Sequence, residues 1–178
     1  GAGVDRLDGT AMKRLGIDIA NVAGGSNTAL AEYTVSLALV LMRRFSWADA
    51  EIKKGNYVDF RKQMISENLT GLEDMTVGVI GLGSIGLAVA TAFHRMGSTI
   101  VYYDPILKDS TEADQISALG LPLEDVLKLS DVVTLHVPLI PETEGLIGDA
   151  ELSAMNPGSV LIHAARGGVV DEMALAQH

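Results

Sequence analysis

Three glycines with the spacing Gly-x-Gly-x-x-Gly are the feature of this sequence that points most directly to chemistry. They are Gly81, Gly83 and Gly86. A β-branched run at 76–80 precedes them and an apolar helical pattern follows, which is the strand–turn–helix context of a dinucleotide-binding turn. The first glycine permits a tight turn, the second lets the backbone approach a pyrophosphate, and the third lets the helix pack closely on the strand. The amide groups of Ser84 and Ile85, where that helix starts, are expected to face the phosphates.

An acidic residue after a second strand-like run supports the same interpretation. The run at 99–103 ends at Asp104, near the roughly 20-residue distance at which a carboxylate meets the adenosine ribose hydroxyls. A carboxylate there would repel a 2′-phosphate, so it favours NAD. The alternative is a glycine turn without a ligand and an aspartate that only caps a strand end.

Arg166 is the residue best suited to hold a substrate. Strand-like patterns at 132–138 and 159–163 should end at the same edge of a parallel sheet as the glycine turn, and ligands bind outside that edge. Arg166 follows the second pattern and is the only Arg or Lys at these strand ends. A guanidinium there can hold a carboxylate with two hydrogen bonds and polarise an adjacent carbonyl. The alternative is a surface arginine paired with Asp171 or Glu172.

The elements that must position these residues alternate between strand and helix patterns. Helices are expected at 10–15, 28–44, 46–54, 84–96, 112–119, 124–129 and 151–155, with another starting at Asp171; strands are expected at 17–22, 76–80, 99–103, 132–138 and 159–163. The segment 56–68 is polar and is expected to be irregular. The alternation predicts right-handed βαβ units and therefore an α/β fold with a doubly wound parallel sheet.

Two domains are expected. A lone strand at 17–22 needs a sheet to join, so residues 1–27 are interpreted as the tail of another domain and 28–178 as the doubly wound one. The helix at 28–44 is apolar nearly all round, whereas a surface helix needs one apolar stripe. One side is expected to pack on its own domain and the other on a second domain or subunit. The alternative is a central helix of a single core.

Composition excludes several classes of function. The chain has 178 residues, 48% of them apolar and 20% charged, as in a globular domain. Its net charge of -10 argues against a nucleic-acid partner, because such binding needs Lys and Arg to neutralise phosphates. The lack of Cys favours an intracellular, cytoplasmic location. The apolar run at 35–42 is too short to span a bilayer, and we expect neither a membrane nor a metal site.

Six motifs occur in an order that is specific to one family. They are the segments 1–5, 28–32, 81–86, 103–105, 136–139 and 164–171. Together they resemble the D-isomer-specific 2-hydroxyacid dehydrogenases, the family that includes phosphoglycerate dehydrogenase, over essentially the whole chain. The resemblance implies an NAD-binding Rossmann domain and, at residues 1–27, the remnant of a second, flavodoxin-like substrate domain. It also implies an NAD-linked oxidoreductase that acts on a 2-hydroxy or 2-oxo acid, in a homodimer built through helix 28–44.

The resemblance assigns roles to individual residues. Arg166 is the expected catalytic and substrate-binding residue. Coenzyme contacts are expected at Gly81, Gly83, Ser84, Ile85, Gly86, Asp104, Val137, Thr143, Ala164 and Ala165, and substrate contacts at Gly1, Ala2 and Gly3. The acid/base His of the family and its Glu partner would lie after residue 178, so these residues alone are expected to bind NAD weakly and to turn over nothing. The alternative is a non-enzymatic, corepressor-like NAD sensor on the same scaffold.

Overall fold

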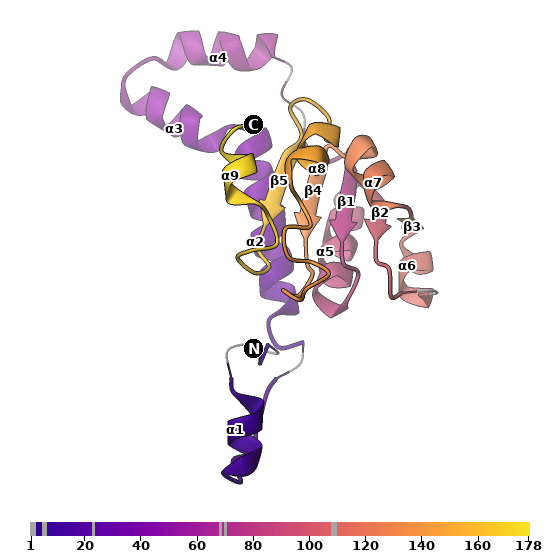
Figure 1. Cartoon of the computed structure of the whole chain (residues 1–178). Coiled ribbons are helices and arrows are strands. Elements are labelled where there is room, and N and C mark those ends of the chain that lie inside the picture. The colour runs from indigo at the N-terminus through magenta and orange to yellow at the C-terminus, as the bar shows by residue number, and fades with distance from the viewer. Residues whose placement is uncertain (1–2, 5–6, 23, 68, 70, 108–109) are drawn as a thin grey trace.

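A wholly parallel sheet forms the centre of the chain (Figure 1). The computed structural model describes residues 3–4, 7–22, 24–67, 69, 71–107 and 110–178. Within these ranges the sheet has five strands in the order β3-β2-β1-β4-β5. They are β1 (Thr76–Ile80), β2 (Thr99–Tyr103), β3 (Leu119–Gly120), β4 (Val132–Leu135) and β5 (Val160–His163). Within the sheet, the chain runs from the central strand β1 through β2 to the edge strand β3, and then returns to the other side of β1 to form β4 and β5. The predicted doubly wound fold is therefore confirmed.

Helices cover both faces of the sheet (Figure 1). Helices α2 (Asn27–Met42) and α5 (Ser84–Arg95) lie on one face, and α7 (Leu123–Leu129) lies on the other. The remaining helices of the described ranges are α1 (Gly9–Arg14), α3 (Phe45–Lys53), α4 (Tyr57–Ser66), α6 (Thr111–Gln115), α8 (Asp149–Ala154) and α9 (Glu172–Leu175). None of those in the described ranges is long and apolar enough to cross a membrane.

The two faces of β1 explain why this strand reads as a continuous apolar run. Val77 and Val79 pack in one buried cluster with α2 and α5, and Ile80 packs in a second cluster with α7 on the opposite face. All three side chains are fully buried. A strand covered on both faces gains from apolar side chains at every position, so the central strands lack the polar alternation of a half-exposed sheet.

Helix α2 is covered on one side. Ala31, Thr34 and Ala38 are buried, and α2 packs extensively on α5. On other sides of the same helix, Tyr33 is 55% and Leu41 is 52% exposed. The helix is therefore not the centre of a single core, and its remaining apolar surface stays open to solvent in this chain.

Three expectations about local structure were wrong. Segment 56–68 contains α4, whose Phe60 is buried against the ring of Trp47 at a centroid distance of 5.7 Å. That contact with the preceding helix is tertiary and leaves no periodic pattern in a polar segment. The pattern at 112–119 ends as a helix at Gln115, and Leu119 instead pairs with Val101 at the edge of the sheet.

The third wrong expectation is the strand at 17–22. These residues form no strand, because no described strand lies beside them, and they are exposed throughout. The backbone N–H of Ile17 instead donates to Met12 at the end of α1 (2.9 Å). Helix α1 has no buried residue and projects from the sheet (Figure 1).

Candidate functional site

The glycine turn is built by two close approaches that a side chain would prevent. Gly81 has φ of +89°, and a Cβ there would lie 2.9 Å from the carbonyl oxygen of His136. A Cβ on Gly86 would lie 2.0 Å from the carbonyl oxygen of Gly81. The turn therefore holds the start of α5 against β1 and the end of β4, as a dinucleotide-binding turn requires.

The middle of the turn is open where the ends are crowded. Apart from Gly83 and its two chain neighbours, no atom lies within 4 Å of a Cβ placed on Gly83, and both Gly83 and Ser84 are exposed. No side chain caps the first turn of α5, so the amide groups at Ser84 and Ile85 face an accessible surface with the positive end of the helix dipole. The residues present thus fit a pyrophosphate: bare backbone, open space and uncapped donors.

Asp104 extends from the end of β2 to this turn. Its Oδ2 accepts a hydrogen bond from the backbone N–H of Leu82 at 2.9 Å. Its Oδ1 accepts from the N–H groups of Ile106 (3.0 Å) and Leu107 (3.1 Å), inside its own loop. The predicted ribose-binding carboxylate therefore lies at the carboxyl edge, and three backbone donors hold it there.

A hollow of about 170 Å³ lies between the ends of β4 and β5 and the starts of α2 and α5. It is lined by Leu30, Ile85, His136, Val137, Pro138, Ala164, Ala165 and Arg166. Five predicted site residues, distant in sequence, meet here, next to the glycine turn. The strands run parallel in register, Leu135 opposite both Ile80 and His163, so their ends share this edge.

Arg166 and His136 are the titratable residues of the hollow. Arg166 is exposed, and its Nη1 donates to the carbonyl of Ala165 at 3.2 Å. The His136 ring lies 2.9 Å, Nε2 to Oγ1, from the buried hydroxyl of Thr134. Burial lowers the pKa of His136 to about 4, so its imidazole is neutral near pH 7.

Other predicted site residues lie outside the hollow. Thr143 uses its hydroxyl within its own loop, donating to the Pro138 carbonyl and accepting from the N–H of Ile140 (3.0 Å). Gly3 is exposed and does not line the hollow. Gly1 and Ala2 fall outside the described residues.

Leu30, Pro138 and His136 line the hollow although none was predicted as a site residue. The strand-end sequence 136–138 was a usable signal, because that edge of a parallel sheet binds ligands. The sequence gives no such signal for Leu30, since any apolar residue of α2 would be interpreted as a packing residue. Leu30 lines the hollow because the first turn of α2 lies at the carboxyl edge of the sheet.

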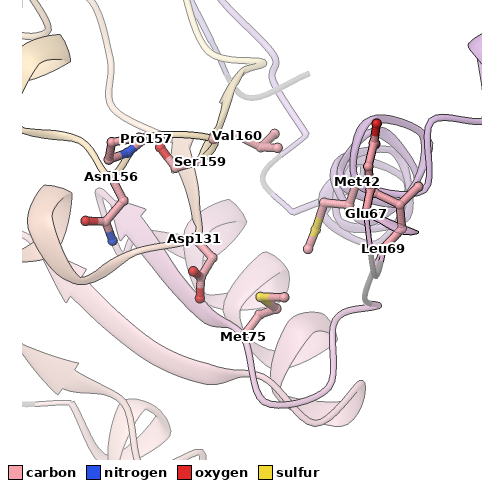
Figure 2. Close-up of a pocket in the computed structure, with 10 residues that line it drawn as sticks. Met42, Glu67, Leu69, Met75, Asp131, Asn156, Pro157, Ser159 and Val160 are labelled. Atoms are coloured by element: carbon pink, nitrogen blue, oxygen red, sulfur yellow. The ribbon is translucent and has the colours of Figure 1, made fainter. Parts of the chain in front are cut away.

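A second hollow, of about 240 Å³, lies at the opposite, amino edge of the sheet (Figure 2). Asp131 and Asn156 lie on one side of it and Met42 and Glu67 on the other. Both carboxylates already have partners: Asp131 accepts from the N–H of Thr76 at 2.8 Å, and Glu67 pairs with Arg44 at 2.8 Å. These contacts hold β1 and the α4 segment in place, so the carboxyl edge is the better candidate site.

Comparison with known proteins agrees with this geometry. The family model described as "D-isomer specific 2-hydroxyacid dehydrogenase, NAD binding domain" matches residues 35–178. D-3-phosphoglycerate dehydrogenase of Archaeoglobus fulgidus is 38% identical over 175 residues, which are 98% of this chain and 32% of that protein. The Homo sapiens enzyme of the same name is 37% identical over 175 residues, with the same shares.

Solved structures share the fold over nearly the whole chain. The apo form of Rhodotorula graminis D-mandelate dehydrogenase has a TM-score of 0.88 at 31% identity, covering 99% of this chain and 52% of that one. The structure of D-2-hydroxyisocaproate dehydrogenase has a TM-score of 0.85 at 33% identity, covering 99% and 52%. The chain thus spans about a third of its curated relatives and about half of these solved chains.

Proposed function

The chain belongs to the D-isomer specific 2-hydroxyacid dehydrogenase family, and on that premise we propose that the protein transfers a hydride between the CH–OH group of a D-2-hydroxy acid and NAD. One observation carries the proposal. The hollow that contains Arg166 opens beside the uncapped start of α5, so a carboxylate and a dinucleotide can be held at one edge. NAD supplies the hydride chemistry when bound, and the protein supplies position and charge.

The start of α5 is proposed to hold the pyrophosphate and Asp104 the adenosine ribose. Val137, Ala164 and Ala165 are proposed to line the coenzyme pocket, and their small or aliphatic side chains exclude water without adding charge. Thr143 is proposed to act through the loop that its hydroxyl closes.

Arg166 is proposed to bind the substrate carboxylate. A guanidinium presents paired donors that match the two oxygens of a carboxylate and orient the adjacent carbon. Its strand-end position beside Ile85 would place that carbon near the coenzyme. The backbone of residues 1–3 is proposed to complete the carboxylate site, as part of the domain to which 1–27 belong.

Proton transfer is proposed to depend on a His–Glu pair outside these 178 residues. His136 is the histidine that lines the hollow, and its lowered pKa makes it a poor base near pH 7. We therefore expect the 178 residues alone to bind NADH and to show no turnover, whereas a protein that also contains the His–Glu pair should turn over substrate.

The test is turnover by the complete protein with D- and L-isomers of 3-phosphoglycerate, lactate and mandelate, the first chosen because of the relatives at 37–38% identity. Oxidation of one D-isomer with reduction of NAD supports the proposal. The Arg166→Ala variant distinguishes the enzyme from the alternative of a non-enzymatic NAD sensor. Loss of turnover with retained NADH affinity supports the enzyme, and NADH-dependent association that is insensitive to this change supports the sensor.

The assembly is proposed to be a homodimer through α2. The support is the exposed apolar surface of that helix, with Tyr33 and Leu41 about half exposed. A cytoplasmic location is proposed from the absence of Cys.

A further inference from the structure

Asp104 connects the end of β2 to the glycine turn through its carboxylate. The Leu82 N–H to which it bonds belongs to the residue between Gly81 and Gly83. Leu82 itself is buried at 5% exposure, so its amide depends on a protein acceptor, and Asp104 provides one. The neighbouring Gly81 N–H has a different partner, the Tyr103 carbonyl at 2.8 Å.

The carboxylate has little accepting capacity left for a ligand. A carboxylate offers roughly four lone-pair positions. Two on Oδ1 are used by Ile106 and Leu107 and one on Oδ2 by Leu82, which leaves about one on Oδ2. Most of what Asp104 does in the coenzyme-free protein is therefore to bind backbone.

We propose that Asp104 is a positioning residue for the pyrophosphate as well as a ribose contact: it holds the turn 81–84 in its phosphate-binding conformation before the coenzyme arrives. This inference rests on the proposed coenzyme site. The physical reason is preorganisation. If the turn samples other conformations, the apparent dissociation constant rises in inverse proportion to the fraction that is competent to bind.

The Leu82 amide is the point at which Asp104 restrains the turn. No side chain caps α5, and the middle of the turn is held by two carbonyls: that of Gly83 accepts from the Leu87 N–H (2.8 Å) and that of Ser84 from the Asn27 side chain (3.1 Å). Neither contact involves the Leu82 N–H. Glycine also adds backbone freedom that must be lost on binding. A charge-assisted hydrogen bond to Leu82 removes part of that freedom in advance.

The test separates the ribose from the phosphates by choice of ligand. Dissociation constants for ADP and 2′,3′-dideoxy-ADP are measured by calorimetry for the protein, for Asp104→Asn and for the control Asp125→Asn, whose carboxylate is exposed on α7. The dideoxy ligand has no ribose hydroxyls. We expect Asp104→Asn to weaken dideoxy-ADP by about tenfold, the scale of a lost charge-assisted bond, and Asp125→Asn to change it less than twofold.

Hydrogen exchange of the unaltered, ligand-free protein supplies a second measurement that needs no variant. We expect the Leu82 amide to exchange slowly, at a rate comparable to the Gly81 amide. In the Asp104→Ala variant the Leu82 amide should exchange faster, while the Gly81 amide, which is bonded to the Tyr103 carbonyl, should stay protected. A general loss of structure would release both.

Two results would overturn the proposal while leaving the coenzyme site intact. One is an unchanged dideoxy-ADP affinity in Asp104→Asn while ADP weakens, which restricts Asp104 to the ribose. The other is a fast Leu82 amide in the unaltered protein. Failure of the unaltered protein to bind either ADP or NADH would instead reject the proposed coenzyme site, and this inference with it.

Discussion

The Gly86 Cα hydrogen points at the carbonyl oxygen of Gly81, and a methyl group in its place would lie 2.0 Å from that oxygen. This contact brings the first turn of α5 onto the end of β1. Gly83, between the two, has free space at its own Cβ position. The three glycines of one motif therefore serve different physical purposes, and this can be measured.

We predict that Gly86→Ala lowers the free energy of unfolding by about 2–3 kcal/mol and the affinity for NADH by more than about tenfold, because the turn must open to admit the methyl group. Gly83→Ala is the matched change. Its φ of −66° suits alanine, so stability should stay within about 0.5 kcal/mol. NADH affinity should still fall, because the methyl group occupies the space of the phosphates. Urea unfolding and NADH fluorescence titration measure the two effects, and equal stability losses would contradict the prediction.

A glycine outside the motif, Gly78, is predicted to affect stability without affecting the site. A Cβ there would lie 2.3 Å from the Oγ of Ser130, which follows α7, and 2.7 Å from the Cγ1 of Val126 within that helix. Gly78→Ala should cost about 1–3 kcal/mol with NADH affinity unchanged, because α7 must shift from the sheet. Adding Ser130→Gly should recover part of the loss. Additive losses in the double variant, measured by urea unfolding, would show that the two positions are not coupled.

His136 predicts a pH dependence of stability. Its pKa is about 4 in the folded protein and 6.5 in the unfolded chain, because burial disfavours the imidazolium. Between these values the unfolded state binds a proton that the folded state does not, so stability falls as the pH falls from 6.5 to 4. The contribution present above pH 6.5 is about 3 kcal/mol. Urea unfolding at pH 4.5, 5.5 and 7 measures it. His136→Gln should flatten this part of the profile, and an unchanged profile would contradict the assignment.

The exposed side of α2 is predicted to mediate self-association. Leu41→Glu should convert the dimer to a monomer in sedimentation equilibrium, because a carboxylate at a buried interface loses its hydration. Leu129→Glu is the control: Leu129 is 54% exposed, on α7 at the other face of the sheet. It should leave the dimer intact. A monomeric unaltered protein, or dissociation by both changes, would reject the α2 interface.

The parts of this molecule that could be predicted from sequence are those in which neighbours along the chain decide the conformation. The turn at Gly81–Gly86 depends on glycine freedom within six residues, and β1 and β2 lie at the predicted bounds. The elements that were not predicted depend on contacts between distant residues. Helix α4 depends on the Trp47–Phe60 contact and β3 on pairing with Val101, and neither partner is visible in the segment itself.

The sequence by itself determined the doubly wound fold, the positions of its principal strands along the chain and the glycine turn, because apolar patterning and glycine spacing act through local sterics and burial. Only the tertiary structure decided which side chains share the hollow at the carboxyl edge and how they are bonded. Leu30 lines the same hollow as Arg166 because α2 begins at that edge, and Asp104 reaches Leu82 because β1 and β2 end together. Such contacts join residues that are far apart in the chain, so they depend on how elements pack and not on the residues that flank them.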